Sequence, residues 1–165
     1  MWSPYLIGPP QKIRSLNTSQ GLGDRLRLVA FAERQAFHAF NEAAQRFTDA
    51  PGELIQAWKW VALEEAKHES WLVNRLKELG QEVSDSPVSL NLYYSLQKCE
   101  SARDFALYVS DAEERGRVGA EKFALSLAQT DPITAAIFKQ IALEEVGHIA
   151  LVERFFEKSM SRGSP

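Results

Sequence analysis

The sequence predicts an all-α protein, a four-helix bundle with one long crossover connection between its second and third helices. Two observations support this. Four long segments place apolar residues three and four positions apart, which is the spacing of amphipathic helices. In addition, Val61–His68 recurs 80 positions later as Ile141–His148, with five of eight positions identical. A repeat of this kind indicates two related helical hairpins, and the crossover would join them.

The chain is 165 residues long, enough for one domain, residues 1–165, with a full core. Its net charge of −3 argues against a strong general attraction to nucleic acid or to an anionic membrane, although a local basic patch stays compatible with it. The single cysteine, Cys99, excludes a disulfide framework within the chain and any site built from several cysteines. No apolar run reaches the roughly 18 residues of a membrane span, and the first residues show no signal-peptide pattern. We therefore expect a cytoplasmic protein.

The expected elements follow from apolar spacing and from helix start and stop signals. An N-terminal arm, 1–21, carries three helix-breaking prolines. The apolar residues expected to pack this arm along the bundle are Leu6, Ile7, Ile13 and Leu16. The bundle spans 22–160, and a frayed tail, 161–165, follows it. The expected helices are 22–48, 52–79, 102–129 and 132–158. Residues 81–100 form the extended crossover.

The repeat contains a Glu-x-x-His motif in each copy, and residues three apart on a helix share one face. If the 80-residue shift relates whole hairpins, it should also map a residue of the first helix onto the third. Glu33 maps onto Glu113, and helical-wheel positions favour these two over the neighbouring carboxylates. The predicted metal ligands are Glu33, Glu65, His68, Glu113, Glu145 and His148.

Four carboxylates and two neutral imidazoles carry a charge of −4, which two divalent cations neutralise. Oxygen and nitrogen ligands without thiolate suit iron or manganese, whereas zinc usually takes four ligands. The ligand types alone therefore predict two ions of iron or of manganese. The other interpretation is that these residues are solvated polar positions on ordinary helices.

Two further residues are candidates to support the metal ligands. Glu69 follows Glu65 by one turn and could be an extra ligand or an acceptor beside the site, or else an exposed or salt-bridged carboxylate. Arg117 follows Glu113 by one turn and could pair with a ligand carboxylate or an anionic substrate. Its alternative is an ion pair with Glu114 or Glu121.

The motifs resemble the ferritin-like superfamily over nearly the whole chain. Within it, the sequence is most similar to a ferritin-like domain family of unknown function related to the tRNA hydroxylases that act on hypermodified adenosine. The segments that carry the resemblance are Arg14–Leu16, Glu33–Ala36, Glu65–His68, Glu113–Gly116 and Glu145–His148. The resemblance implies a four-helix bundle with a di-iron centre, but it implies no particular reaction.

Three functions fit these expectations. The first is a di-iron oxidoreductase that uses dioxygen or peroxide, such as a hydroxylase of a small organic or nucleoside group, with an external electron donor because no flavin or iron–sulfur motif is present. The second is a ferroxidase or peroxide scavenger without an organic substrate. The third is a tRNA-binding protein with a basic patch of Lys12, Arg14, Arg25 and Arg27. A homodimer is plausible for each of the three.

Overall fold

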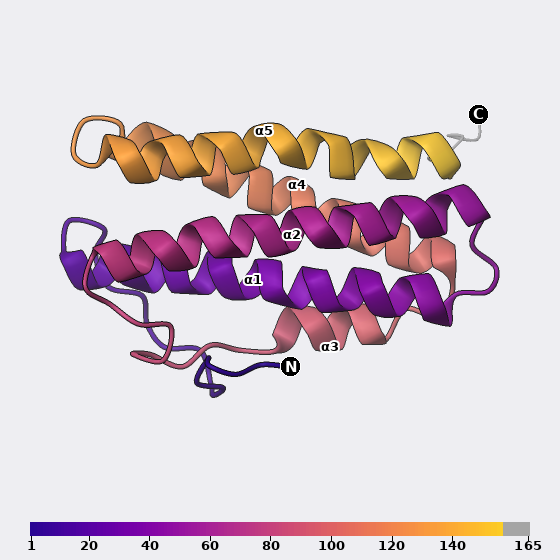
Figure 1. Ribbon diagram of the computed structural model, residues 1–165, viewed down its shortest axis with the longest axis horizontal. Helices are drawn as coiled ribbons and strands as arrows, with labels where there is room; N and C mark the ends of the chain where they lie inside the picture. Colours follow the sequence, from indigo (N-terminus) through magenta and orange to yellow (C-terminus); the bar gives the residue numbers. More distant parts are fainter. Residues whose placement is uncertain (157–165) are drawn as a thin grey trace, which may run out of the picture. The chain divides into compact units, whose positions relative to one another are not determined.

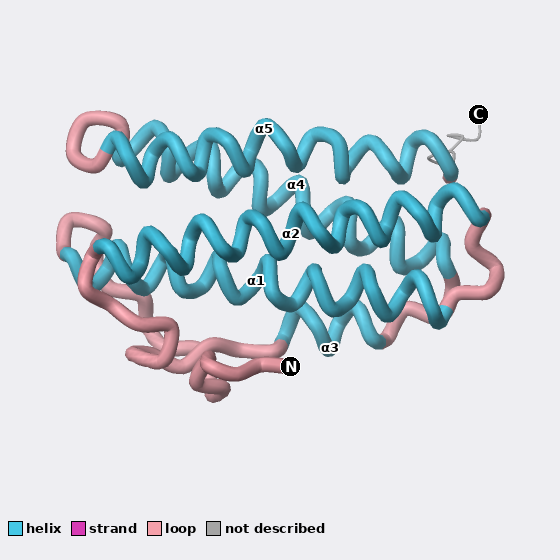
Figure 2. The backbone as a smooth tube through the Cα atoms, in the orientation of Figure 1, coloured by secondary structure: helices cyan, strands magenta, loops and turns pink. Residues whose placement is uncertain are grey.

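The computed structural model describes residues 1–156, and every regular element in that range is an α-helix (Figures 1 and 2). The prediction of an all-α chain is confirmed. The only strand-like pairing among the described residues is an isolated bridge between Ile7 and Val88. The helices are α1 (Ser19–Arg46), α2 (Gly52–Glu78), α3 (Asn91–Gln97), α4 (Ala102–Leu127) and α5 (Pro132–Phe155). Among the described residues, no helix combines the length and apolar character that crossing a membrane would require.

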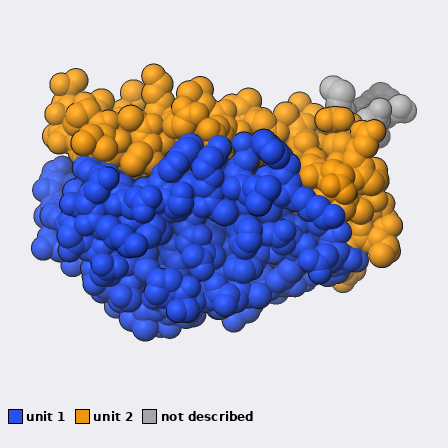
Figure 3. Space-filling model, viewed as in Figure 1, with its two compact units in different colours: residues 1–46, 58–98 blue, residues 47–57, 99–165 orange. Residues whose placement is uncertain are grey.

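The chain divides into two compact units, which Figure 3 colours separately. Unit 1 comprises residues 1–46 and 58–98, and therefore holds α1, most of α2, and α3. Unit 2 comprises residues 47–57 and 99–165, and holds α4 and α5. The single domain and the bundle arrangement of the helices stay predictions.

In unit 1, local capping contacts fix the ends of the first two helices. The hydroxyl of Thr18 accepts a hydrogen bond from the Gly21 amide at 3.0 Å, so α1 begins three residues before the predicted start. Helix α2 ends at Glu78, one residue before the predicted end. Gly80 follows with a φ of +70°, and the Gln81 amide donates to the Leu76 carbonyl at 3.1 Å. This left-handed glycine closes the helix in the expected manner.

In unit 2, α4 and α5 pack against each other as a hairpin. The Ser101 hydroxyl accepts from the Asp104 amide at 3.1 Å, and the Asp131 carboxylate accepts from the Thr134 amide at 3.0 Å. Both caps agree with the predicted helix starts. Helix α4 ends at Leu127 rather than near 129. The predicted end of the last helix near 158 and the frayed tail 161–165 lie outside the described residues.

The expectation of an extended segment over residues 81–100 is wrong for its second half, because 91–97 form α3, which packs on α1. Leu92 and Leu96 are spaced by one helical turn, and Leu96 is buried. Arg46 of α1 donates to the backbone carbonyls of Leu96 and Gln97 at the end of α3. The segment therefore folds locally onto α1, and a long crossover stays a prediction.

The N-terminal arm packs only in part through the residues expected, since Ile13 and Leu16 are half-buried but Leu6 and Ile7 are exposed. Leu6 and Ile7 are 51% and 40% exposed, whereas Tyr5 is buried. The ring of Trp2 makes edge contacts with Phe31 and with His38 of α1, at centroid distances of 5.7 and 5.0 Å. Large aromatic rings bury more apolar area than aliphatic side chains, so the arm is held by Trp2 and Tyr5.

Candidate metal centre

Unit 1 brings together three of the predicted ligands, Glu33 of α1 with Glu65 and His68 of α2. One potential ligand atom from each lies within 4.8 Å of the others. Glu65 and His68 have no exposed surface, and Glu33 is 7% exposed. The pair on α2 shares a face because its members are three residues apart. We call these three residues the unit 1 cluster.

Unit 2 brings together the other three predicted ligands, Glu113 of α4 with Glu145 and His148 of α5. Their potential ligand atoms also lie within 4.8 Å of one another. Glu145 and His148 are buried, and Glu113 is partly exposed. Nδ1 of His148 lies 3.1 Å from Oε2 of Glu145. We call these three residues the unit 2 cluster, and it has the same two-carboxylate, one-imidazole composition as the first.

Each cluster fits a divalent cation by distance and by charge. Donor atoms that each lie about 2.1 Å from one ion are at most about 4.2 Å apart. The potential ligand atoms of each cluster lie within 4.8 Å of one another, so a small inward movement of the side chains is enough for them to coordinate an ion. Two carboxylates and a neutral imidazole carry −2, which one divalent ion neutralises. Burying the carboxylates without a compensating charge would be costly, and a bound cation removes that cost.

Glu69 is not one of the three residues of the unit 1 cluster but forms a part-buried ion pair beside it. Its Oε2 accepts from Arg34 Nε at 2.7 Å, and its Oε1 accepts from the Tyr5 hydroxyl at 2.8 Å. Burial and the Glu69 carboxylate raise the pKa of Tyr5 above its usual value. Burial disfavours the Arg34 cation, but its hydrogen bond to the Glu69 carboxylate more than offsets this and raises the pKa of Arg34. Of the alternatives for Glu69, the structure therefore places it in a salt bridge.

Arg117 forms ion pairs along α4 itself, with residues that are not predicted ligands. Its guanidinium donates to Glu114 at 2.6 Å and to Glu121 at 2.6 Å. These two carboxylates raise the pKa of Arg117, with its hydrogen bond to Glu114 as the main cause. The surface ion pair was the alternative to a role at the metal site, and it is the arrangement found.

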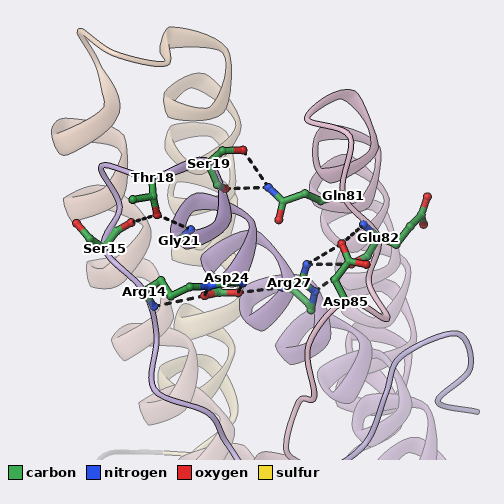
Figure 4. A network of polar contacts seen from close by, with 10 residues as sticks. All are labelled: Arg14, Ser15, Thr18, Ser19, Gly21, Asp24, Arg27, Gln81, Glu82 and Asp85. Atoms are coloured by element: carbon green, nitrogen blue, oxygen red, sulfur yellow. Dashed lines mark hydrogen bonds and ion pairs between the residues drawn. The ribbon is translucent and has the colours of Figure 1, made fainter.

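A second polar network in unit 1 was missed by sequence reasoning (Figure 4). Arg27 is 1% exposed, donates to Asp24 at 3.2 Å, and donates to the Glu82 carbonyl at 3.0 and 2.9 Å. Arg14 binds the same Asp24 carboxylate through two bonds of 2.7 Å. The network thereby ties the arm and the segment after α2 to α1.

This network corrects the expected basic patch. Arg27 is not a surface cation, because its guanidinium is buried and engaged, and Arg14 is held by Asp24. A surface patch of all four basic residues is therefore wrong. The i,i+3 spacing of Asp24 and Arg27 was the signal available in the sequence, since such pairs meet on one helix face.

Comparison with known proteins places the chain in a family. A family described as "Protein of unknown function (DUF455)" matches residues 3–164. The chain belongs to this family. It is also similar to an uncharacterized protein of Haemophilus influenzae (strain ATCC 51907 / DSM 11121 / KW20 / Rd), with 29% identity over 174 aligned residues. The alignment covers 97% of this chain but only 60% of the relative. No solved structure matches the chain.

Proposed function

We propose that this member of the family is a non-haem di-iron oxidoreductase of ferritin-like architecture that activates dioxygen or peroxide. The observation that carries the proposal is the presence of two clusters with the same composition, each with two carboxylates and one imidazole whose donor atoms lie within 4.8 Å. Oxygen and nitrogen donors of this kind suit iron. That the two ions act as one pair comes from the sequence repeat and from the resemblance to ferritin-like proteins.

In this proposal each cluster would hold one iron, and the iron pair would activate dioxygen or peroxide, which is the oxidant. Glu33, Glu65 and His68 would bind the first ion, and Glu113, Glu145 and His148 the second. The burial of five of these six residues keeps bulk water from the ligands, which strengthens electrostatic interactions at the site. Electrons would come from an external reductase, in the reducing setting of the cytoplasm.

The substrate in this proposal is a small organic group. The buried Arg27 and the Arg14–Asp24 ion pair remove two cations from the patch that would have favoured tRNA. The ferroxidase and peroxide-scavenging alternatives share the same clusters, so they differ from the proposal in the products and not in the ligands.

Elemental analysis and optical spectroscopy test the proposal. Protein from iron-replete expression should contain two irons per chain and show a charge-transfer band that disappears on reduction and returns with oxygen. The His68→Ala/His148→Ala variant should lose both the iron and the band, whereas His38→Ala, outside both clusters, should keep them. Undiminished binding of two irons by the double variant would rule out this ligand set. Iron oxidation that consumes oxygen without any oxidised organic product would favour the ferroxidase.

A further inference from the structure

The 80-residue shift that maps the ligands of one cluster onto those of the other does not map the residues beside them. Arg34, which follows Glu33, corresponds to Glu114, and Glu69, which follows His68, corresponds to Ile149. The two clusters therefore share their ligands but differ in what holds those ligands in place.

In unit 1, an ion pair links the two ligand-bearing helices at the level of the cluster. The 2.7 Å bond from Arg34 to Glu69 joins α1 to α2 one residue after Glu33 and one residue after His68. Arg34 also donates to the backbone carbonyls of Met1 and Ser3 at 3.1 and 3.2 Å. Charge-assisted bonds are shorter and stronger than bonds between neutral groups. The rotation of α1 relative to α2 is thereby fixed where the ligands meet.

The arm adds a second constraint to the same carboxylate. The buried Tyr5 hydroxyl donates to Glu69 at 2.8 Å, and the Tyr5 ring packs against Phe31 at a centroid distance of 4.8 Å. The guanidinium of Arg34 lies over the Tyr5 ring, 5.5 Å from its centroid. Three segments of unit 1 are therefore joined at Glu69.

Unit 2 cannot form the equivalent link, because Ile149 carries no charge. Glu114, at the position equivalent to Arg34, binds Arg117 of its own helix at the surface. A side-chain hydrogen bond between α4 and α5 near the cluster runs from the Ser110 hydroxyl to the Ile149 carbonyl and is 3.5 Å long, the limit for such a bond.

The helices of unit 2 are also intrinsically weaker beside their ligands. Gly116 and Gly119 follow Glu113, and Gly147 precedes His148, where unit 1 has Ala36, Ala39 and Lys67. A glycine inside a helix costs about 1 kcal/mol relative to alanine. Within the described part of unit 2, a Cβ added at any of the three glycines would meet no atom within 4 Å. Packing in unit 2 therefore does not require these glycines.

We infer that the unit 1 cluster is a preorganised metal site of high affinity, whereas the unit 2 cluster is less preorganised, binds its ion more weakly and exchanges it. Tyr5, Arg34 and Glu69 are the positioning residues that cause the difference. The inference rests on the proposed metal-binding function. Ligands already held in place lose less conformational freedom when the ion binds, so the ion binds more tightly.

Titration of the metal-free protein with Co²⁺ alone, followed by its visible absorption bands, tests this inference. The wild type should bind two ions in two steps whose dissociation constants differ at least tenfold. His68→Ala should remove the tighter step and His148→Ala the weaker one. Two equal steps, or loss of the tighter step in His148→Ala, would overturn the inference while leaving the proposed function intact. A wild type that binds no Co²⁺ and no Fe²⁺ would overturn the proposed function itself.

Milder variants test the positioning residues. Tyr5→Phe and Glu69→Gln should each weaken the tighter step about tenfold, the lower end for loss of a residue that supports metal ligands, and leave the weaker step and its spectrum unchanged. Tyr94→Phe, which removes an exposed hydroxyl from unit 1, should change neither step. Gly147→Ala should strengthen only the weaker step. Equal weakening of both steps by Tyr5→Phe would show a general loss of structure and would contradict the assignment.

Discussion

Arg34 Nε and Glu69 Oε2 lie 2.7 Å apart and connect α1 with α2 directly beside Glu33 and His68. Neither side chain is freely solvated, since the Arg34 side chain is 24% exposed and the Glu69 side chain 9%. An ion pair of this kind contributes to a unique arrangement of two helices. If one partner is removed, the charge of the other partner stays in the interior without a counter-charge.

We expect Arg34→Met to lower the free energy of unfolding of the metal-free protein by about 3 kcal/mol, because Glu69 would stay buried without its cation. Urea denaturation measures this change. Arg154→Met is the matched control, since Arg154 and its partner Glu53 are 65% and 77% exposed, and its effect should be much smaller. Equal effects of the two substitutions would show that the Arg34 ion pair is not effectively buried.

The helices and the proximity of the candidate ligands within each unit could be predicted because both depend on local spacing. A three-residue interval places Glu65 beside His68 whatever surrounds them, and the 80-residue repeat extends this relation to Glu113 and Glu145. Within each unit the candidate ligand atoms lie close together because the period of the helices places these residues on one face.

The features that could not be predicted depend on contacts between distant segments. Glu69 has the same local sequence context whether it faces solvent or Tyr5, which is 64 positions away. Residues 91–97 have weak helix signals, and α3 forms where α1 offers Arg46 and Gln35 as partners for its backbone. The local sequence around Arg27 is that of a surface cation. Its burial depends on a hydrogen bond to the Glu82 carbonyl, which is 55 positions away.

The buried guanidinium of Arg27 should matter more to stability than the exposed one of Arg14, although both bind Asp24. Arg27→Met would leave the Glu82 carbonyl and part of Asp24 without a donor, and we expect a loss of about 3 kcal/mol in the free energy of unfolding. Arg14→Met should cost clearly less, because the Arg14 side chain is 49% exposed. Thermal and urea denaturation of both variants give the comparison, and the reverse order would contradict the structure.

Asp24 should make the protein sensitive to acid. The hydrogen bond from Arg14 lowers the pKa of Asp24 below its usual value of 3.8, and its folded-state pKa is thus below its unfolded one. The stability that Asp24 contributes is therefore fully present above about pH 4 and is lost as the pH falls through the lowered value.

The dependence of the unfolding free energy on pH, measured between pH 2 and pH 5, tests this expectation. Asp24→Asn should be less stable than the wild type near neutral pH, and the difference should shrink as the pH falls. A constant difference over this range would show that the charge of Asp24 is not responsible.

The Tyr93 hydroxyl should lose its proton at a higher pH than an ordinary tyrosine, and this should make the stability of the protein sensitive to base. Burial and a hydrogen bond to Glu42 raise the pKa of Tyr93 from 10.0 to about 12. Because the folded pKa exceeds the unfolded one, the contribution of Tyr93 is present below pH 10 and is lost as the pH rises towards 12. Tyrosinate absorbance should show a transition near pH 12 that Tyr93→Phe removes and that Glu42→Gln moves towards pH 10. An unchanged transition in Glu42→Gln would exclude Glu42 as a cause.

Metal removal should destabilise the protein through the two clusters. Four carboxylates that converge in pairs repel each other, and the repulsion within each pair is relieved by a divalent ion. An ion that binds only the folded state raises the free energy of unfolding by about 2.7 kcal/mol when its free concentration is 100 times its dissociation constant. We therefore expect Fe²⁺, added without oxygen, to raise the melting temperature, and a chelator to reverse the rise. Glu65→Gln/Glu145→Gln should melt higher than the wild type without metal, because two buried charges are removed, yet respond less to Fe²⁺. The same response in this variant and in the wild type would place the stabilising ions elsewhere.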